Sequence, residues 1–184
     1  NIVSSGGNAR AAAVIVADTG AIVALVDADD RHHAALRRLF ETSPDDWVLP
    51  WAMLPEVDYL LAEHVSARAQ ERFSGDLASG AWAIEWGDPA DLVRAEEISR
   101  RHRGLRLGLV DSVVMAVAER RRADAIATLD LRHFGAVTLR GRPRLVPRDL
   151  VGPAVGGRPI SVDHAIHSSM RVMPPACSVG QAAG

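Results

Sequence analysis

The chain of 184 residues contains no lysine, so all 21 of its basic residues are arginine. It therefore cannot carry the Gly-Lys-Thr or Gly-Lys-Ser phosphate loop, in which a lysine contacts the phosphates. A single cysteine, Cys177, excludes an internal disulfide and a zinc site built from several cysteines. No apolar run approaches the roughly 20 residues that span a bilayer, and the apolar stretch 11–16 lacks the charged start of a signal peptide. We therefore expect a cytoplasmic protein that is not embedded in a membrane.

The charge balance of the chain is close to neutral. Its 23 acidic residues outnumber the arginines and give a formal net charge of -2, which is not the bulk signature of a nucleic-acid-binding protein. Arginine can still grip phosphate through paired hydrogen bonds, so local clusters could form an RNA track. The alternative for each cluster is a solvated surface that complements the negative end of a helix. The clusters contain Arg100, Arg101, Arg103 and Arg106; Arg120, Arg121 and Arg122; and Arg140, Arg142, Arg144 and Arg148.

Short apolar segments alternate with segments of helical periodicity. The segment 13–17 is rich in β-branched residues, as expected of a strand that is buried on both faces. The other predicted strands are 47–49, 81–86, 125–128, 137–139 and 145–146. The predicted helices are about 21–26, 31–42, 54–65, 66–80, 88–104 and 109–122. This alternation predicts an α/β protein in which helices cover both faces of a mainly parallel sheet. Four tryptophans are expected in the core rather than as stacking platforms: Trp47, Trp51, Trp82 and Trp86.

Composition divides the chain into three parts. Residues 1–12 are mostly small and polar and are expected to form a loose leader. The periodic segments give one folded domain over 13–150. From residue 151 to 184 Gly, Pro, Ser and Ala dominate and periodicity is lost, which predicts a tail of low order. His164 and His167 lie in this tail, and we do not expect them to bind a metal.

Four acidic residues are predicted to meet at one end of the sheet. In open α/β sheets, ligands bind beyond the carboxyl ends of the strands. Asp18 directly follows the first strand, and Asp130 follows the strand 125–128. Glu56 opens the helix after the second strand, and Asp111 lies in the first turn of the helix that precedes Asp130. The fold therefore predicts a cluster of four carboxylates.

Such a cluster is suited to a divalent cation. Neighbouring carboxylates raise one another's pKa, and a cation removes this conflict. Ligands that are all oxygen favour Mg²⁺ or Mn²⁺ over zinc. The cation would lower the pKa of a water molecule and neutralise charge on a phosphodiester, by itself or as one of a pair. Hydroxyls that flank three of the acids could orient carboxylates or waters: Thr19, Ser112 and Thr128.

Each acid also has a structural interpretation without function. Asp18 could cap the helix that follows it, and Glu56 could favour the positive end of a helix dipole. Asp130 could form a turn. Asp111 is harder to explain in this way, because its apolar neighbours threaten to bury its charge. The four acids together, at matching ends of their elements, favour a metal site.

The segments that carry these acids resemble the PIN-domain toxins of the VapC type. The resemblance covers about Ile15 to Leu150, and it is specific because four motifs occur in order and at the right spacing. One departure is Ser112, where the family often has alanine. The resembling segments are 16–25, 29–35, 55–61, 107–112 together with 117–118, and 128–134.

This resemblance implies a fold and an activity. The fold would be a PIN-like three-layer α/β/α arrangement with a central, mainly parallel sheet. The activity would be that of a Mg²⁺- or Mn²⁺-dependent endoribonuclease, the toxin of a type II toxin–antitoxin pair that cleaves structured RNA such as tRNA or rRNA and so blocks translation. It further implies a homodimer and a cognate antitoxin whose tail covers the acidic site. The metal-binding and catalytic role would fall to Asp18, Glu56, Asp111 and Asp130.

Two other functions remain open. An aspartate-nucleophile phosphatase or a phosphate-accepting receiver domain would use Asp18 as the phosphorylated group. Their usual sites need a lysine, which this chain lacks. A PIN-like module that binds RNA or protein without catalysis is the other alternative, and the presence of all four acids speaks against it.

Overall fold

The structure is a computed structural model and describes residues 13–148. The predicted leader 1–12 and tail 151–184 lie outside these residues, as do His164, His167 and Cys177. The proposed division of the chain into three parts therefore stays a prediction. Between residues 13 and 148, every helix is too short or too polar to cross a membrane.

Among residues 13–148, the central sheet has five strands. These are β1 (Ile15–Ala17), β2 (Trp47–Pro50), β3 (Ala83–Glu85), β4 (Ala125–Ala127) and β5 (Arg144–Val146). Their order is β3-β2-β1-β4-β5, and every neighbouring pair is parallel. The chain builds outward from β1 to β3 and then returns to the other side of β1. The strand order therefore reverses between β1 and β4, which is where open α/β sheets bind ligands.

Alternate residues of the central strands face opposite layers, because strand side chains repeat with a period of two. In β1, Ile15 and Ala17 pack into one apolar cluster, whereas Val16 packs into the other. Strand β4 repeats this pattern, with Ile126 on the side of Val16. Both clusters are buried, so the continuous apolar run of β1 is explained by burial on two faces, as predicted.

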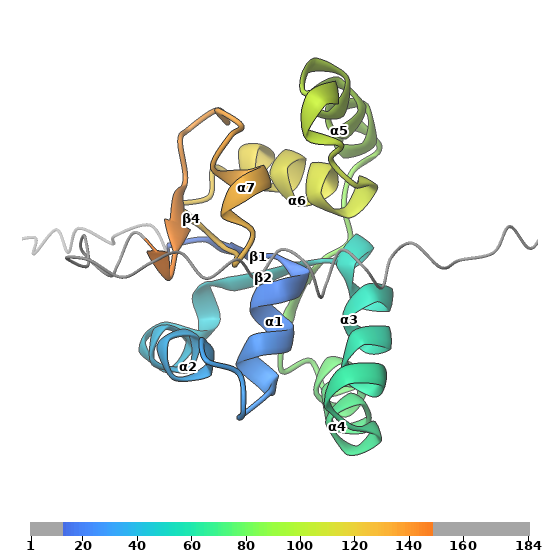
Figure 1. Cartoon of the computed structure of the whole chain (residues 1–184), viewed down its shortest axis with the longest axis vertical. Helices are drawn as coiled ribbons and strands as arrows, with labels where there is room; N and C mark the ends of the chain where they lie inside the picture. Colours follow the sequence, from blue (N-terminus) through green and yellow to red (C-terminus); the bar gives the residue numbers. More distant parts are fainter. Residues whose placement is uncertain (1–12, 149–184) are drawn as a thin grey trace, which may run out of the picture. The chain divides into compact units, whose positions relative to one another are not determined.

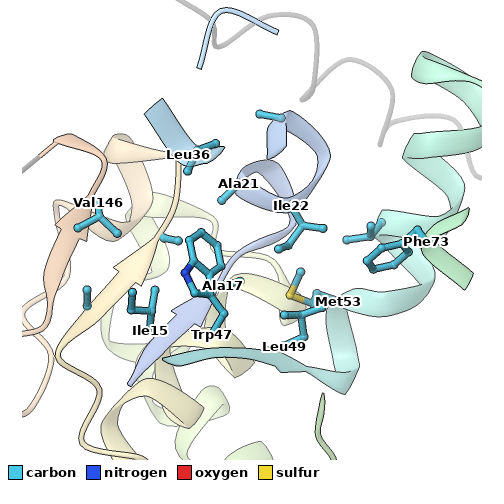
Figure 2. Close-up of a cluster of buried hydrophobic side chains, with 14 of the residues drawn as sticks. Ile15, Ala17, Ala21, Ile22, Leu36, Trp47, Leu49, Met53, Phe73 and Val146 are labelled. Atoms are coloured by element: carbon cyan, nitrogen blue, oxygen red, sulfur yellow. The ribbon is translucent and has the colours of Figure 1, made fainter. Parts of the chain in front are cut away.

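Four helices cover one face of the sheet (Figure 1): α1 (Thr19–Val26), α2 (His33–Thr42), α3 (Leu54–Leu60) and α4 (Ala67–Ala78). Figure 2 shows the core beneath them, in which Trp47 of β2 lies among Ile22, Leu36 and Leu49. Helix α4 begins as predicted, because the Ser66 hydroxyl accepts a hydrogen bond from the Ala69 amide at 3.1 Å. Short helical turns complete this half: η1 (Pro44–Asp46), η2 (Trp51–Met53) and the π-helical turn η3 (Leu61–Val65).

The opposite face is covered by α5 (Pro89–Arg101), the turn η4 (Arg103–Leu105), α6 (Leu109–Arg120) and α7 (Leu131–Phe134) (Figure 1). Helix α6 is buried along 112–118, between the sheet and α5. Two arginines form ion pairs between α5 and α6. The Arg120 guanidinium donates to both oxygens of Asp91 at 2.8 and 2.9 Å, and Arg94 donates to both oxygens of Glu119 at 2.7 and 2.9 Å. The predicted solvated surface at Arg120 is thus an interhelical ion pair.

Three sequence-based expectations differ from the structure. Residues 137–139 form no strand. Val137 and Leu139 are buried against the cluster beneath α6 and Thr138 is exposed, but the backbone here is a bend followed by an irregular segment. Helix α7 was not predicted, since four residues are too few to show a helical period. Of the four tryptophans, Trp51 and Trp86 are exposed rather than in the core, and Trp86 follows the edge strand β3.

Candidate active site

Asp18 lies at the reversal of strand order. Its amide donates to the Ala127 carbonyl at 2.9 Å, which continues the pairing of β1 with β4 beyond the last strand residues. It occupies the N-cap position of α1, yet its side chain makes no capping hydrogen bond. Instead, Oδ2 accepts the Thr128 hydroxyl at 2.9 Å. Helix capping therefore does not account for this carboxylate.

The surroundings of Asp18 disfavour its negative charge. The residue is only 6% exposed. The pKa of Asp18 is raised from 3.8 to about 7: burial is the largest cause, and the negative charge of Asp111 and, to a smaller extent, that of Asp130 act in the same direction. Hydrogen bonds from the Thr128 hydroxyl and the Thr19 amide act against this rise. Without a cation, Asp18 thus tends to hold a proton near neutral pH.

Asp111 lies centrally among the acids. Its negative charge raises the pKa of Asp18 and also that of Glu56. It sits in the first turn of α6, where Oδ2 accepts the Gly108 amide at 3.0 Å. The hydroxyl of Ser112 donates to the Gly108 carbonyl at 2.9 Å, so it fixes the start of α6 rather than contacting a carboxylate in this structure.

Glu56 joins the site from the other half of the fold. It lies in the first turn of α3, and its Oε2 accepts the Thr19 hydroxyl at 2.6 Å. Partial burial raises the pKa of Glu56, the Thr19 hydroxyl lowers it, and the charge of Asp111 raises it again. Thr19 is the first residue of α1, so this bond ties the helix after β1 to the helix after β2.

Asp130 closes the cluster from β4. Its amide donates to the Thr128 hydroxyl at 3.0 Å, and its Oδ1 accepts the His133 amide at 2.9 Å, which caps α7. The turn-forming interpretation is therefore correct for one oxygen. The other oxygen, Oδ2, lies 2.7 Å from Nδ1 of His133.

His133 is a site residue that sequence reasoning did not single out. It is 1% exposed, and the same Nδ1 lies 3.4 Å from Oδ2 of Asp111. Its Nε2 lies 3.1 Å from the Leu105 carbonyl, an oxygen that only accepts, so Nε2 carries a proton. The imidazole thus links the acids of α6 and β4 to the turn η4. The signal in the sequence was its place three residues after Asp130, within the segment 128–134 that resembles the family.

The four predicted acids therefore come together from β1, α3, α6 and the end of β4. Their oxygen donors and the carboxylate charges that raise the pKa of Asp18 suit a hard divalent cation. In the part of the chain that the structure describes, no three acidic or imidazole side chains are yet arranged tightly enough to surround one ion. The four acids are linked here by electrostatic coupling, by the hydroxyls of Thr19 and Thr128, and by the imidazole of His133.

Comparison with known proteins identifies the family of the chain. The sequence model of the PIN domain family matches residues 15–138. A model of FAD-dependent oxidoreductases matches residues 143–184, less than half of the chain and almost wholly outside the described residues. Ribonuclease VapC26 of Mycobacterium tuberculosis is 33% identical over 123 residues, which are 67% of this chain and 91% of that protein.

Two solved structures share the fold. VapC20 of Mycobacterium tuberculosis, described as a Sarcin-Ricin loop cleaving toxin, matches with a TM-score of 0.61 and 24% identity, over 70% of this chain and 99% of that one. The DNA-bound VapBC of Salmonella typhimurium matches with a TM-score of 0.57 and 16% identity, over 72% of this chain and 96% of that one. The three-layer α/β/α architecture with a parallel sheet is thus confirmed. Because the family model spans most of the domain and the Mycobacterium relative is matched over nearly its whole length, this chain belongs to the PIN-domain family and is of the VapC type.

Proposed function

We propose that this chain is a divalent-metal-dependent endoribonuclease, the toxin of a toxin–antitoxin pair, which cleaves structured RNA such as tRNA or rRNA. The main observation that supports the proposal is the buried Asp18. Its side chain makes no helix-capping hydrogen bond, and the charges of Asp111 and Asp130 raise its pKa. The similarity to Ribonuclease VapC26 supports the same activity.

Asp18, Glu56, Asp111 and Asp130 would hold Mg²⁺ or Mn²⁺. When bound, the cation would lower the pKa of a water molecule and offset charge that develops on the phosphodiester. Thr128 orients Asp18, and Thr19 orients Glu56, each through its hydroxyl hydrogen. These hydroxyls also limit the rotamers of the acids, so that less entropy is lost when the acids gather around an ion.

Partners follow from the same proposal. The solved structure from Salmonella is of a VapBC complex, which supports a cognate antitoxin as a partner of this chain. A polypeptide segment with a cationic side chain would be attracted to the four acids in the way that a metal ion is. We further expect the chain to form a homodimer, as the resemblance to the family implies.

The test is RNA cleavage with defined cations. Purified wild-type protein is incubated with total tRNA and rRNA in Mg²⁺, in Mn²⁺ and in EDTA, and the new RNA ends are sequenced. We expect cleavage at discrete positions with either cation, none in EDTA, and none for Asp18→Asn or Asp111→Asn. Asp29→Asn, an exposed acid outside the cluster, is the matched control and should cleave normally. Cleavage at the wild-type rate by Asp111→Asn would refute the proposed site.

A further inference from the structure

An open cavity lies beside the acidic cluster, between α5 and the start of α6. Its volume is about 510 Å³, and its lining includes Leu92, Arg103, Arg106 and Leu109. Gly108 and Ser112 line it too, and these residues flank Asp111 in the sequence. Gly108 also donates its amide to the Asp111 carboxylate. The groove therefore borders the first turn of α6, which carries Asp111.

The arginines of this groove differ from those at the other end of α6. Arg94 and Arg120 are committed to acids at 2.7 to 2.9 Å, where they hold α5 against α6. Among residues 13–148, neither Arg103 nor Arg106 forms an ion pair. Within this range, two positive charges of the groove therefore have no counterion.

The remaining charged groups of the groove nearly cancel. Arg100 lies 3.1 Å from Glu96, and both side chains are more than half exposed. Such an exposed pair is weak and contributes little net charge. The walls are apolar and open to solvent, with Leu92 52% and Leu109 69% exposed. The groove thus combines two free guanidinium groups with exposed apolar contacts, a surface suited to phosphates and to the faces of nucleobases.

We propose that this groove binds the RNA strand next to the cleaved bond, with Arg103 and Arg106 on successive phosphates. The inference rests on the proposed nuclease function and names the surface that presents RNA to its acids. The acids themselves repel RNA, so cations beside them are needed to hold a polyanion at the site. Arg106 has a left-handed backbone (φ 54°), the conformation through which η4 turns into α6.

The test measures RNA binding against salt concentration, in a cleavage-deficient Asp18→Asn background. The probe is a short fluorescein-labelled RNA, single-stranded or as a hairpin, followed by anisotropy. Each lost phosphate contact should reduce the slope of log affinity against log salt by about 0.7 for a single strand. We expect that reduction for Arg103→Ala and for Arg106→Asn, since asparagine tolerates the left-handed backbone. Arg106→Lys should restore the slope, because it restores the charge.

Arg72→Ala is the matched control. Arg72 is an exposed arginine on α4, which lies across the sheet from α5 (Figure 1). The proposal that the groove binds RNA would be wrong if Arg103→Ala and Arg106→Asn left the salt slope unchanged. It would also be wrong if Arg72→Ala reduced the slope by the same amount. A change of oligomeric state in Leu109→Ser, with RNA binding intact, would assign the groove to a second copy and would also overturn it.

The two proposals fail in different ways. If the wild-type protein cleaves no RNA with Mg²⁺ or Mn²⁺, but the salt slope depends on Arg103 and Arg106, the groove stands as an RNA-binding surface and the nuclease proposal falls. If cleavage occurs but the slope of log affinity against log salt does not depend on either arginine, the nuclease proposal is supported and the RNA-binding role of the groove is refuted.

Discussion

Replacement of Asp18 by asparagine should make the metal-free protein more stable while it removes the proposed function. Burial, together with the charges of Asp111 and Asp130, raises the pKa of Asp18 from 3.8 to about 7. The stabilising contribution of this proton is fully present below pH 3.8. Above that pH the unfolded chain releases the proton while the folded chain keeps it, so stability falls until the pH passes about 7. A shift of about three pKa units corresponds to about 4 kcal/mol of the free energy of unfolding.

Asparagine carries no charge at any of these pH values, and its amide oxygen can still accept the Thr128 hydroxyl. The advantage of Asp18→Asn over the wild type should therefore widen by roughly 2–3 kcal/mol between pH 5 and pH 8. Urea unfolding in EDTA, followed by tryptophan fluorescence, measures this difference. Asp29→Asn should follow the wild type. Parallel pH curves for the wild type and Asp18→Asn would show that the burial argument is wrong.

Mg²⁺ should narrow the difference in stability between the wild type and Asp18→Asn. A cation that binds the folded state stabilises it by about 2.7 kcal/mol at a hundredfold excess over its Kd. The wild type should gain this stability at pH 8, because its carboxylate is then available. Asp18→Asn should gain much less. Equal stabilisation of both proteins would place the cation away from Asp18.

The other predictions concern the supports of the site. Arg120→Ala leaves Asp91, whose side chain is 5% exposed, without its bidentate partner. The free energy of unfolding, measured in urea, should therefore fall by about 2–3 kcal/mol. Arg37→Ala, which breaks an exposed ion pair, should show no measurable change. His133→Ala should weaken Mg²⁺ binding measured by calorimetry by roughly 10–100-fold, because the acids lose the ring that positions them. His133→Asn keeps a donor towards Asp130 and should recover part of that loss; equal losses in both variants would argue for a purely structural role.

The strands and most helices could be predicted because local signals agreed with the tertiary fold. The apolar run of β1 is buried on both faces, and Ser66 and Asp88 cap the helices that follow them. The prediction at 137–139 failed because alternation reports only which side chains are buried. It does not report whether the backbone pairs with a neighbouring strand, and these residues pack against a cluster from an irregular segment.

The candidate site was predictable to the extent that topology determines it. Carboxyl ends of parallel strands share one edge of the sheet, so Asp18 and Asp130 had to lie near each other once β1 and β4 paired. The place of His133 depends on a four-residue helix, and its contact with Leu105 joins residues far apart in the chain. The groove depends on how α5 packs against α6. Neither has a periodic signal in the sequence.

Three aspartates occupy N-cap positions in this chain, and they differ in whether their side chains make a capping hydrogen bond. Asp88 accepts the Ala90 amide at 2.8 Å, and Asp130 accepts the His133 amide at 2.9 Å, so both satisfy free amides at a helix start. Asp18 holds the same position before α1, yet its side chain makes no capping hydrogen bond. A cap contributes about 0.5–2 kcal/mol, which Asp18 forgoes in addition to the cost of its raised pKa. An N-cap aspartate that makes no capping hydrogen bond and destabilises the metal-free fold is expected at a functional site, where function rather than stability selects the residue. The position of Asp18 at the end of β1 fits this expectation.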